Sequence, residues 1–364
     1  MYYIGLMSGT SMDAIDCALV SFENDKTDLV YYSQYPLENN IKQGVRSVNA
    51  KVDVDVVNQL DIQLGHLFAQ ATNSMLEQAG FEPGKITAIG SHGQTVLHEP
   101  DAPQPFSLQI ANPNIIANET GILTVADFRN MDIAAGGQGA PLAPAFHEFQ
   151  FRTTDKNRVV LNIGGIANIT ILPRDENIDV TGFDTGPGNA LMDNWAQKHL
   201  NTEMDKDGLW AISGQINKEL LDEMLKDRYF GKIPPKSTGI EYFNLEWLEK
   251  FDNKSRPEDI QATLLMLTVQ TIAGAIEKYA PETDEVLVCG GGAHNKSVMH
   301  ALRKQLPGIN VVLTSEFGLD PDCIEAITFA WLAKRRIENK PGNLPSVTGA
   351  SKPVLLGTLY KAAV

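Results

Sequence analysis

Two glycine-centred segments of the chain carry the residue types that bind phosphate. We call Ile4–Asp13 the first clamp and Leu161–Asn168 the second clamp. In each, an apolar run enters a turn of small residues and a second apolar run leaves it, a pattern that predicts a β-hairpin. Glycine lets backbone N–H groups approach a polyphosphate closely, and the hydroxyls of Ser8, Thr10 and Ser11 add donors. The pair predicts a nucleotide gripped from two sides.

Neither clamp contains a lysine, and the chain has no GxxxxGK[ST] loop, which disfavours a Walker-type NTPase. Phosphate charge must then be met by backbone N–H groups, hydroxyls and a divalent cation. Asp13 and Asp16 offer the carboxylate oxygens that Mg²⁺ prefers. The alternative makes Asp13 a turn residue and places Asp16 on the exposed face of the hairpin.

A third glycine-rich segment, Val286–Asn295, is an apolar run that ends in Gly290, Gly291 and Gly292. A strand followed by glycines is, on its own, more often a tight turn than a binding site. Together with the two clamps it is a more specific signal for a nucleotide site.

Gly182–Ala190 predicts a strand end, a turn and a helix start, with Asp184 among glycines that leave room for a ligand. A carboxylate on a loop just after the second clamp is a candidate general base. The alternative is that Asp184 is a helix cap or an Asx-turn residue.

Ser91–Thr95 gathers hydrogen-bonding groups at a predicted strand end, a place where polar side chains often orient a sugar. His92 is equally explained as a structural histidine with its hydrogen bonds satisfied. The planar guanidinium of Arg129 matches a carboxylate or phosphate bidentately. The alternative for Arg129 is a surface ion pair with Asp127 or Asp132.

Alternating strand and helix signals predict an α/β layer structure that positions these groups. Apolar residues at helical spacing predict a long helix over 54–79, which Gly80 ends. The remaining expected elements are strands over 86–91, 107–110, 122–126, 285–289 and 310–314, a helix from Asn112-Pro113 to Gly121, and helices over 217–229, 261–279 and 323–337.

The Gly/Ala/Pro-rich stretch 134–141 interrupts these patterns just before the second clamp. We expect an N-terminal lobe over residues 1–130, a C-terminal lobe over 131–340, and a tail over 341–364 that packs back on the N-terminal lobe. We also expect the helix over 323–337 to return toward the first lobe.

The composition excludes several classes of protein. With 364 residues the chain can form two domains, and a net charge of −15 makes nucleic acid or an anionic membrane an unsuitable partner. No run approaches the roughly 20 apolar residues of a membrane helix, and Met1-Tyr2-Tyr3 lacks the basic start of a secretory signal, so we expect a cytoplasmic protein. Cys17, Cys289 and Cys323 lack paired spacing and are expected to be core residues without disulfides.

The motifs together resemble those of the anhydro-N-acetylmuramic acid kinases over essentially the whole chain. The matching segments, in order, are Gly5–Asp13, Ser91–Thr95, Asp127–Arg129, Ala134–Leu142, Asn162–Asn168, Phe183–Asn189 and Gly290–Asn295. The resemblance implies the two-lobed actin-like, ribonuclease H-like fold with duplicated βββαβα-type domains and an active site in the cleft between them. One departure is Ala14, where the family usually has glycine; since alanine adds only a methyl group, we expect nucleotide binding to survive.

The resemblance also implies an ATP- and Mg²⁺-dependent reaction on 1,6-anhydro-N-acetylmuramic acid, a fragment of recycled bacterial cell wall, giving N-acetylmuramic acid 6-phosphate. Asp184 would deprotonate a water that attacks the anomeric carbon, while the bridge oxygen leaves and captures the γ-phosphoryl group. Thr95, Arg129 and Glu325 would contact the sugar, although Glu325 is equally explained as a first-turn partner of a helix dipole. ATP would be bound by Gly9, Thr10, Ser11, Met12, Asp13, Asp16, Gly164, Gly165, Asn168, Gly290, Gly291 and Asn295, with Asp13 holding Mg²⁺ directly or through water.

Two rival hypotheses remain open on the sequence. One is an ordinary sugar kinase of the same fold, in which Asp184 takes a proton from a substrate hydroxyl. The other, from a different class, is a nucleotide-driven chaperone or filament protein. The sequence leaves the oligomeric state open, with a homodimer as one option.

Overall fold

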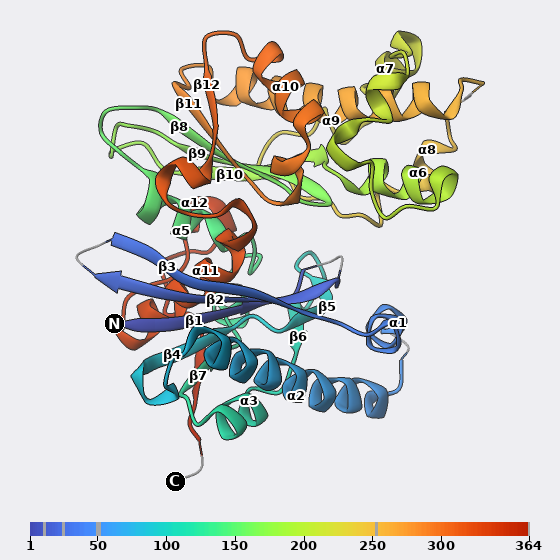
Figure 1. The fold of residues 1–364 in the computed structure, drawn as a ribbon. Coiled ribbons are helices and arrows are strands. Elements are labelled where there is room, and N and C mark those ends of the chain that lie inside the picture. Colours follow the sequence, from blue (N-terminus) through green and yellow to red (C-terminus); the bar gives the residue numbers. More distant parts are fainter. Residues whose placement is uncertain (10–11, 24–25, 49–51, 252–253, 363–364) are drawn as a thin grey trace. The chain divides into compact units, whose positions relative to one another are not determined.

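The structure is a computed structural model that describes residues 1–9, 12–23, 26–48, 52–251 and 254–362. The chain divides into two compact units. Unit 1 comprises residues 1–150 and 323–364, and unit 2 comprises residues 151–322. Each unit is an α/β structure built on one main sheet (Figure 1).

The main sheet of unit 1 has six strands in the order β13-β7-β4-β1-β2-β3. β2 runs antiparallel to both β1 and β3, whereas β1, β4 and β7 are parallel. The strands are β1 (Tyr2–Met7), β2 (Ala14–Glu23), β3 (Lys26–Pro36), β4 (Ile86–Ser91), β7 (Thr124–Ala126) and β13 (Thr358–Tyr360). A separate hairpin is formed by β5 (Gln94–Glu99) and β6 (Phe106–Ile110).

Alternation along β1 directs its side chains to two different helical layers. Ile4 and Leu6 join a buried cluster with Leu64 and Phe68 of α2 (Val54–Ala79). Gly5 lies between them in sequence, and a Cβ there would be 1.7 Å from the carbonyl oxygen of Ala326 in α11 (Ile324–Ile337). Because successive residues of a strand face opposite sides, α2 and α11 cover opposite faces of this sheet (Figure 1).

Unit 1 also contains shorter helices outside these strands. They are α1 (Asn39–Ser47), α3 (Pro113–Thr120), α4 (Asn130–Ala134), α5 (Ala143–Phe151, whose last residue lies in unit 2) and α12 (Pro345–Thr348). The predicted signals at α2 and α3 are confirmed: Asn112 caps α3, and Gly80 and Gly121 end the two helices in the left-handed conformation.

The sheet of unit 2 has five strands in the order β10-β9-β8-β11-β12. They are β8 (Arg158–Ile163), β9 (Ile166–Leu172), β10 (Thr181–Pro187), β11 (Glu285–Cys289) and β12 (Asn310–Leu313). β9 is antiparallel to β8 and β10, and β8, β11 and β12 are parallel. The first five strands of the unit 1 sheet, β3-β2-β1-β4-β7, have the same order and directions, so the topology occurs twice.

One long helix, α9 (Pro257–Tyr279), is the centre of the unit 2 core. Its apolar residues pack with those of β8 and β11. By length and composition α9 could cross a membrane, but 72% of its most apolar window is buried inside the unit, as expected of a core helix. The other helices are α6 (Ala190–Leu200), α7 (Lys218–Met224), α8 (Leu245–Leu248) and α10 (Lys296–Gln305).

The division between units differs from the one expected from the sequence. The boundary lies at 150/151 and not near residue 130, and the chain returns to unit 1 at Cys323, within the expected C-terminal lobe. The Gly-rich stretch is anchored inside unit 1 by buried Asp132, and α11 packs on β1 and β4. β13, in the expected tail, pairs with β7.

Several strand ends differ from the expected ones by one or two residues, and two helices differ by more, while the cysteine prediction is confirmed. α9 begins at Pro257, one turn before the expected residue 261, because proline suits the first helical position. α7 ends at Met224 and not at 229, where the chain turns into an aromatic cluster. All three cysteines are buried free thiols.

Candidate active site

Asp184 lies inside β10 and is half-buried, which rules out the alternative roles of helix cap and Asx-turn residue. It sits directly opposite Asn168 of the second clamp in the β9–β10 ladder, and a bulge follows it. Its Oδ2 accepts a hydrogen bond of 2.9 Å from the backbone N–H of Thr238. The Oδ1 atom has no donor within the part of the chain that the structure describes, so it is the oxygen left to take a proton.

The environment of Asp184 raises the pKa of its carboxyl group. Burial raises its pKa to about 6, and the charge of Glu241 acts in the same direction. The hydrogen bond from Thr238 and the charge of Lys236 oppose this rise. A carboxyl group with such a pKa is ionised at neutral pH and can still take up a proton close to it, which makes Asp184 a candidate general base.

The turn of the second clamp is hydrogen-bonded to the backbone at the start of α6. The carbonyl oxygen of Gly164 accepts from the N–H of Asn189 at 2.8 Å, and that of Gly165 accepts from Gly188 and Ala190 at 2.9 and 3.2 Å. These carbonyls are therefore committed to α6. A Cβ at Gly188 would lie 2.3 Å from the Gly164 oxygen, so only glycine fits at this contact.

The third glycine segment adjoins the same turn. A Cβ on Gly290 would be 2.3 Å from Oδ1 of Asn162, and Gly290 has φ of +79°, so this position also requires glycine. Around Gly291 the space is open, its nearest neighbour being Nδ2 of Asn189 at 4.0 Å. Asn295 caps α10 through Oδ1, which accepts from the N–H groups of Ser297 and Val298. Unit 2 thus joins the second clamp, the Gly290 segment and Asp184.

In the first clamp, which belongs to unit 1, the N–H of Met12 donates to the carbonyl of Gly9 at 3.1 Å. Met12 has positive φ, 57°, and a Cβ on Gly9 would meet no atom within 4 Å. The buried hydroxyl of Ser8 has no hydrogen-bond partner within the described ranges, and a bound ligand group would relieve that cost. The predicted residues Thr10 and Ser11 lie outside the residues that the structure describes.

The two acidic residues near the first clamp have different surroundings. Asp13 is exposed and pairs with Lys42 at 3.2 Å. Asp16 is half-buried, and its Oδ1 accepts from Tyr32 and Gln34 of β3, so it does not lie free on an exposed face as the alternative held. Among the described residues no group of three or more His, Cys, Asp or Glu side chains is placed to hold a metal. An exposed Asp13 beside a phosphate clamp fits a Mg²⁺ ion that takes its other ligands from phosphates and water.

Arg129, directly before α4, is oriented by two groups of unit 1 and does not form a surface ion pair. Its Nε and one terminal nitrogen contact Nε2 of His92 at 3.1 and 2.8 Å, and the other donates to the carbonyl of Gly139 at 2.9 Å. Burial lowers its pKa to about 10, while the charges of Glu325 and Asp132 raise it, so Arg129 stays charged at neutral pH.

His92 is buried and serves as the acceptor that fixes Arg129. Its Nδ1 lies 2.9 Å from the carbonyl of Gly93, which requires Nδ1–H and leaves Nε2 as an acceptor. Burial, followed by the charge of Arg129, lowers the pKa of His92 well below its usual value, so the ring is neutral. The alternative of a structural histidine with its hydrogen bonds satisfied is confirmed, and the sequence does not show that Arg129 is its partner.

Glu325 and Thr95 complete the candidate set in unit 1. Phe329, one turn after Glu325 on α11, contacts His92, with ring centroids 4.6 Å apart and ring planes tilted by 37°. Glu325 is reached by solvent, yet the protein around it displaces part of its hydration and, with the charge of Asp16, raises its pKa, while Arg129 lowers it. Thr95 on β5 accepts from Gln109 at 3.1 Å through its hydroxyl. The structure therefore brings Glu325 within electrostatic reach of both Arg129 and Asp16.

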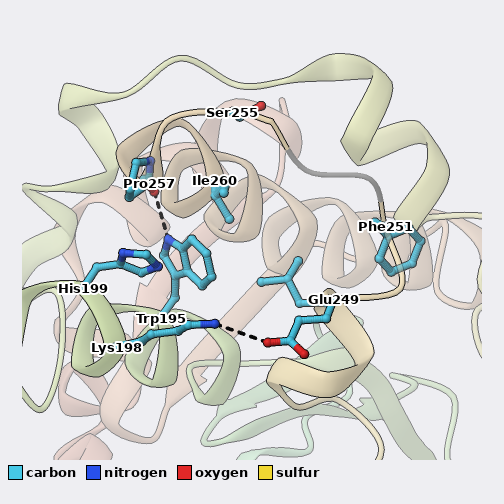
Figure 2. A pocket seen from close by; sticks show the side chains of 9 residues that line it. Trp195, Lys198, His199, Glu249, Phe251, Ser255, Pro257 and Ile260 are labelled. Carbon is cyan, nitrogen blue, oxygen red and sulfur yellow. Dashed lines mark hydrogen bonds and ion pairs between the residues drawn. The ribbon is translucent and has the colours of Figure 1, made fainter.

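A separate groove of about 480 Å³ lies on unit 2, and it contains none of the predicted site residues (Figure 2). Trp195 of α6 forms one wall, and its indole N–H donates to the carbonyl of Pro257 at 2.9 Å. Lys198 pairs with Glu249 at 3.3 Å across the groove. These contacts fasten α6 to α8 and to the start of α9.

Two α/β units with one repeated strand order, each carrying a glycine turn between its first two strands, define the duplicated actin-like fold shared by ATPases and sugar kinases. The sequence model of the anhydro-N-acetylmuramic acid kinase family matches residues 1–362. The chain belongs to this family.

Individual relatives agree along the full length. The chain is 49% identical over 362 residues to the anhydro-N-acetylmuramic acid kinase of Coxiella burnetii (strain RSA 493 / Nine Mile phase I), covering 98% of this chain and 97% of that one. It is 49% identical over 367 residues to the enzyme of the same name from Shewanella pealeana, covering 99% of each. Among solved structures, a ROK family glucokinase from Streptomyces griseus, in complex with glucose and AMPPNP, aligns with a TM-score of 0.41 and 13% identity over 92% of this chain and 100% of that one.

Proposed function

We propose that this protein phosphorylates 1,6-anhydro-N-acetylmuramic acid with ATP and opens the anhydro ring by hydrolysis in the same reaction. The products are N-acetylmuramic acid 6-phosphate and ADP, and the process is cell-wall recycling in the cytoplasm. The single observation that carries the proposal is Asp184, a half-buried carboxylate with a pKa near 6 and one uncommitted oxygen, beside the second clamp.

The proposed chemistry follows from the substrate. Oxygen 6 is tied into an ether bridge and has no proton for a base to remove. Oδ1 of Asp184 takes a proton from water as the water oxygen bonds to the anomeric carbon. The bond from that carbon to oxygen 6 breaks, and oxygen 6 bonds to the γ-phosphorus as ADP leaves. The phosphoryl group captures the leaving oxygen, so the general acid that glycosidases use is not needed.

The remaining candidates bind and orient. On this proposal Gly9, Thr10, Ser11, Met12, Asp13, Asp16, Gly164, Gly165 and Asn168 hold the phosphates, and Gly290, Gly291 and Asn295 face the adenosine. Mg²⁺ held by Asp13, directly or through water, would neutralise phosphate charge. Arg129, already oriented by His92 and Gly139, contacts the sugar together with Thr95 and Glu325.

An ADP-release assay over a panel of sugars tests the proposal. We expect release with the anhydro-amino sugar and little with N-acetylglucosamine, glucose or no sugar. Release that is equal with an ordinary hexosamine would favour a conventional sugar kinase. Release without any sugar, or assembly on ATP binding, would favour a nucleotide-driven chaperone or filament protein.

A further inference from the structure

The segment Lys236–Glu241, between α7 and α8, is hydrogen-bonded to the strand that carries Asp184. The N–H of Asp184 donates to the carbonyl of Lys236 at 3.1 Å, and the N–H of Thr238 donates to Oδ2 of Asp184 at 2.9 Å. The two bonds bracket the residue through its backbone and its side chain. Any shift of this segment therefore moves the carboxylate.

Three aromatic residues, Tyr229, Tyr242 and Trp247, which we call the aromatic platform, contact the segment through Tyr229. The Tyr229 hydroxyl donates to the carbonyl of Asp184 at 2.7 Å, and the Lys236 ammonium lies 4.6 Å from the centre of the Tyr229 ring. Asp227 fixes the platform because it accepts from the N–H of Tyr229, the hydroxyl of Tyr242 and the indole of Trp247 at 2.8 to 2.9 Å. Three donors on one carboxylate make a rigid anchor.

The far end of the segment reaches the second clamp. A Cβ built on Gly165 would lie 3.2 Å from the Cγ2 methyl of Ile240, so Ile240 packs against the clamp turn. One short stretch of chain thus contacts both the candidate phosphate turn and the candidate base.

Charged groups on this segment face Asp184 with opposite effects. Lys236 lowers the pKa of Asp184 and Glu241 raises it, after the larger effect of burial. Burial lowers the pKa of Lys236, and so do Lys278 of α9 and Lys232, while Asp184 raises it. Lys236 is therefore the cation that affects the pKa of Asp184, whereas Lys232 affects the pKa of Lys236.

We propose that Lys236–Glu241 is a positioning segment for the base: the Thr238 N–H occupies Oδ2 so that Oδ1 accepts the proton from water, and Lys236, whose carbonyl accepts from the Asp184 N–H, places a cation near the carboxylate. The proposal rests on the proposed function, in which Asp184 is the base. Lys236 and Thr238 act through Asp184 and do not need to touch the substrate.

The first test compares Lys236→Met with Lys232→Met in the full-length protein, using the pH profile of kcat/KM for the anhydro-sugar. Loss of the nearby cation favours the protonated acid, so we expect the acid limb of Lys236→Met to move up by about half a pH unit or more. Lys232→Met should leave the limb in place. An unmoved limb in Lys236→Met, or equal shifts in both variants, overturns the role of Lys236.

The second test addresses the N–H of Thr238. Thr238→Ala keeps this donor, whereas Thr238→Pro removes it. We expect the acid limb of the proline variant to lie above that of the alanine variant, with kcat at least about 10-fold lower and an unchanged KM for ATP. Coincident profiles would refute the role of the N–H. If the proline variant does not fold, the lysine pair still tests the segment through Lys236.

The outcomes separate this proposal from the proposed function. Absence of sugar-dependent ADP release by the unmodified protein would refute the function itself. An active unmodified protein with variants that keep its pH profile would refute only the positioning role.

Discussion

At the scale of single residues, Asp184 combines fixed geometry with an ionisation near neutral pH. Its backbone N–H and carbonyl are both hydrogen-bonded, and Oδ2 of its carboxylate accepts from Thr238. Oδ1 is therefore held in one orientation. Such preorganisation lets a base act without first reorganising its surroundings. The energetic cost is that the ionised carboxylate has lost part of its hydration, which disfavours the charged form.

The first prediction concerns pH. A base must be ionised to work, and burial raises the pKa of Asp184 to about 6. We therefore expect kcat/KM to be constant above that pH and to fall about tenfold per pH unit below it. Rates measured from pH 4.5 to 8 in constant ionic strength check this. A limb near pH 4 would mean that the acid is not buried Asp184.

The second prediction concerns Asp184→Asn, which should keep ATP binding and lose turnover by about 10²-fold or more. It should also be more stable than the unmodified protein at pH 8, by at most about 3 kcal/mol. The sign follows because the folded-state pKa is raised: the stability is fully present below the unfolded value of 3.8 and is lost as pH rises through about 6. Asparagine does not ionise, so the variant does not lose this stability as the pH rises.

Thermal unfolding at pH 8 and pH 4 measures this difference, with ATP binding as the control for intact folding. The advantage of the variant should vanish at pH 4, where both side chains are neutral or nearly so. Near-normal sugar-dependent ADP release by Asp184→Asn would refute the role of Asp184 as the base.

At the scale of elements, glycines permit close contacts between helices and sheet. In unit 1 a Cβ at Gly90 of β4 would be 1.9 Å from the carbonyl oxygen of Phe329 in α11. That contact brings Phe329 over His92 and sets Glu325 on the same side of α11. The spacing between this helix and the sheet therefore positions a candidate sugar contact.

Gly90→Ala should lower the free energy of unfolding by about 1–3 kcal/mol or more, because α11 must move off the sheet. Gly84→Ala is the matched control. A Cβ there meets nothing within 4 Å, and its expected effect is between zero and about 1 kcal/mol of stabilisation. Urea unfolding of both variants gives the comparison, and equal stabilities would contradict the packing argument.

Asp132 links the Gly-rich stretch to the C-terminal segment of unit 1. This fully buried carboxylate accepts from Asn343 and Thr348 through Oδ1 and from the N–H of Gly139 through Oδ2. Gly139 in turn holds Arg129 through its carbonyl. A single carboxylate thus connects the last part of the chain to a candidate sugar ligand.

Asp132→Ala should destabilise the protein by about 3–5 kcal/mol, because three buried donors lose their acceptor. Where it folds, KM for the sugar should rise more than KM for ATP. The exposed Asp101→Ala serves as control for loss of one negative charge. Equal changes in both KM values would show that the network stabilises the fold without orienting Arg129.

At the scale of the whole molecule, the same strand order occurs in both units, and each places a glycine turn between its first two strands. The copies differ in their acidic residues. The first clamp has Asp13 and Asp16 nearby, whereas the second has Asp184 across from Asn168. Phosphate contacts are proposed for both units, while the proposed base belongs to unit 2 alone.

The sequence predicts the parts of this fold that depend on local signals. α2 matches the expected helix from end to end because Gly80 ends a long helical repeat, and the strands at Ile86–Ser91 and Glu285–Cys289 match their apolar runs. The expected return of the helix over 323–337 toward the first lobe is confirmed, since α11 packs on β1 and β4. The position of the boundary at Cys323 has no local signal.

The hydrogen-bond partners of the candidate base Asp184 could not be predicted from the sequence. Tyr229 and Thr238 lie 45 and 54 residues from Asp184 in the chain, and nothing in their local sequence marks them as its partners. Likewise, the sequence marks His92 and Arg129 as separate candidate residues, but not the hydrogen bond between them, which joins positions 37 residues apart. Such contacts follow from tertiary packing and not from spacing.

The central claim is that hydrolysis of the anhydro ring and phosphorylation are one coupled reaction. Running the reaction in ¹⁸O-labelled water and locating the label by mass spectrometry and NMR tests it directly. We predict one labelled oxygen at the anomeric carbon of the N-acetylmuramic acid 6-phosphate and none in the phosphate. A phosphorylated product with no label at the anomeric carbon, measured before ring-opening exchange, would contradict the account.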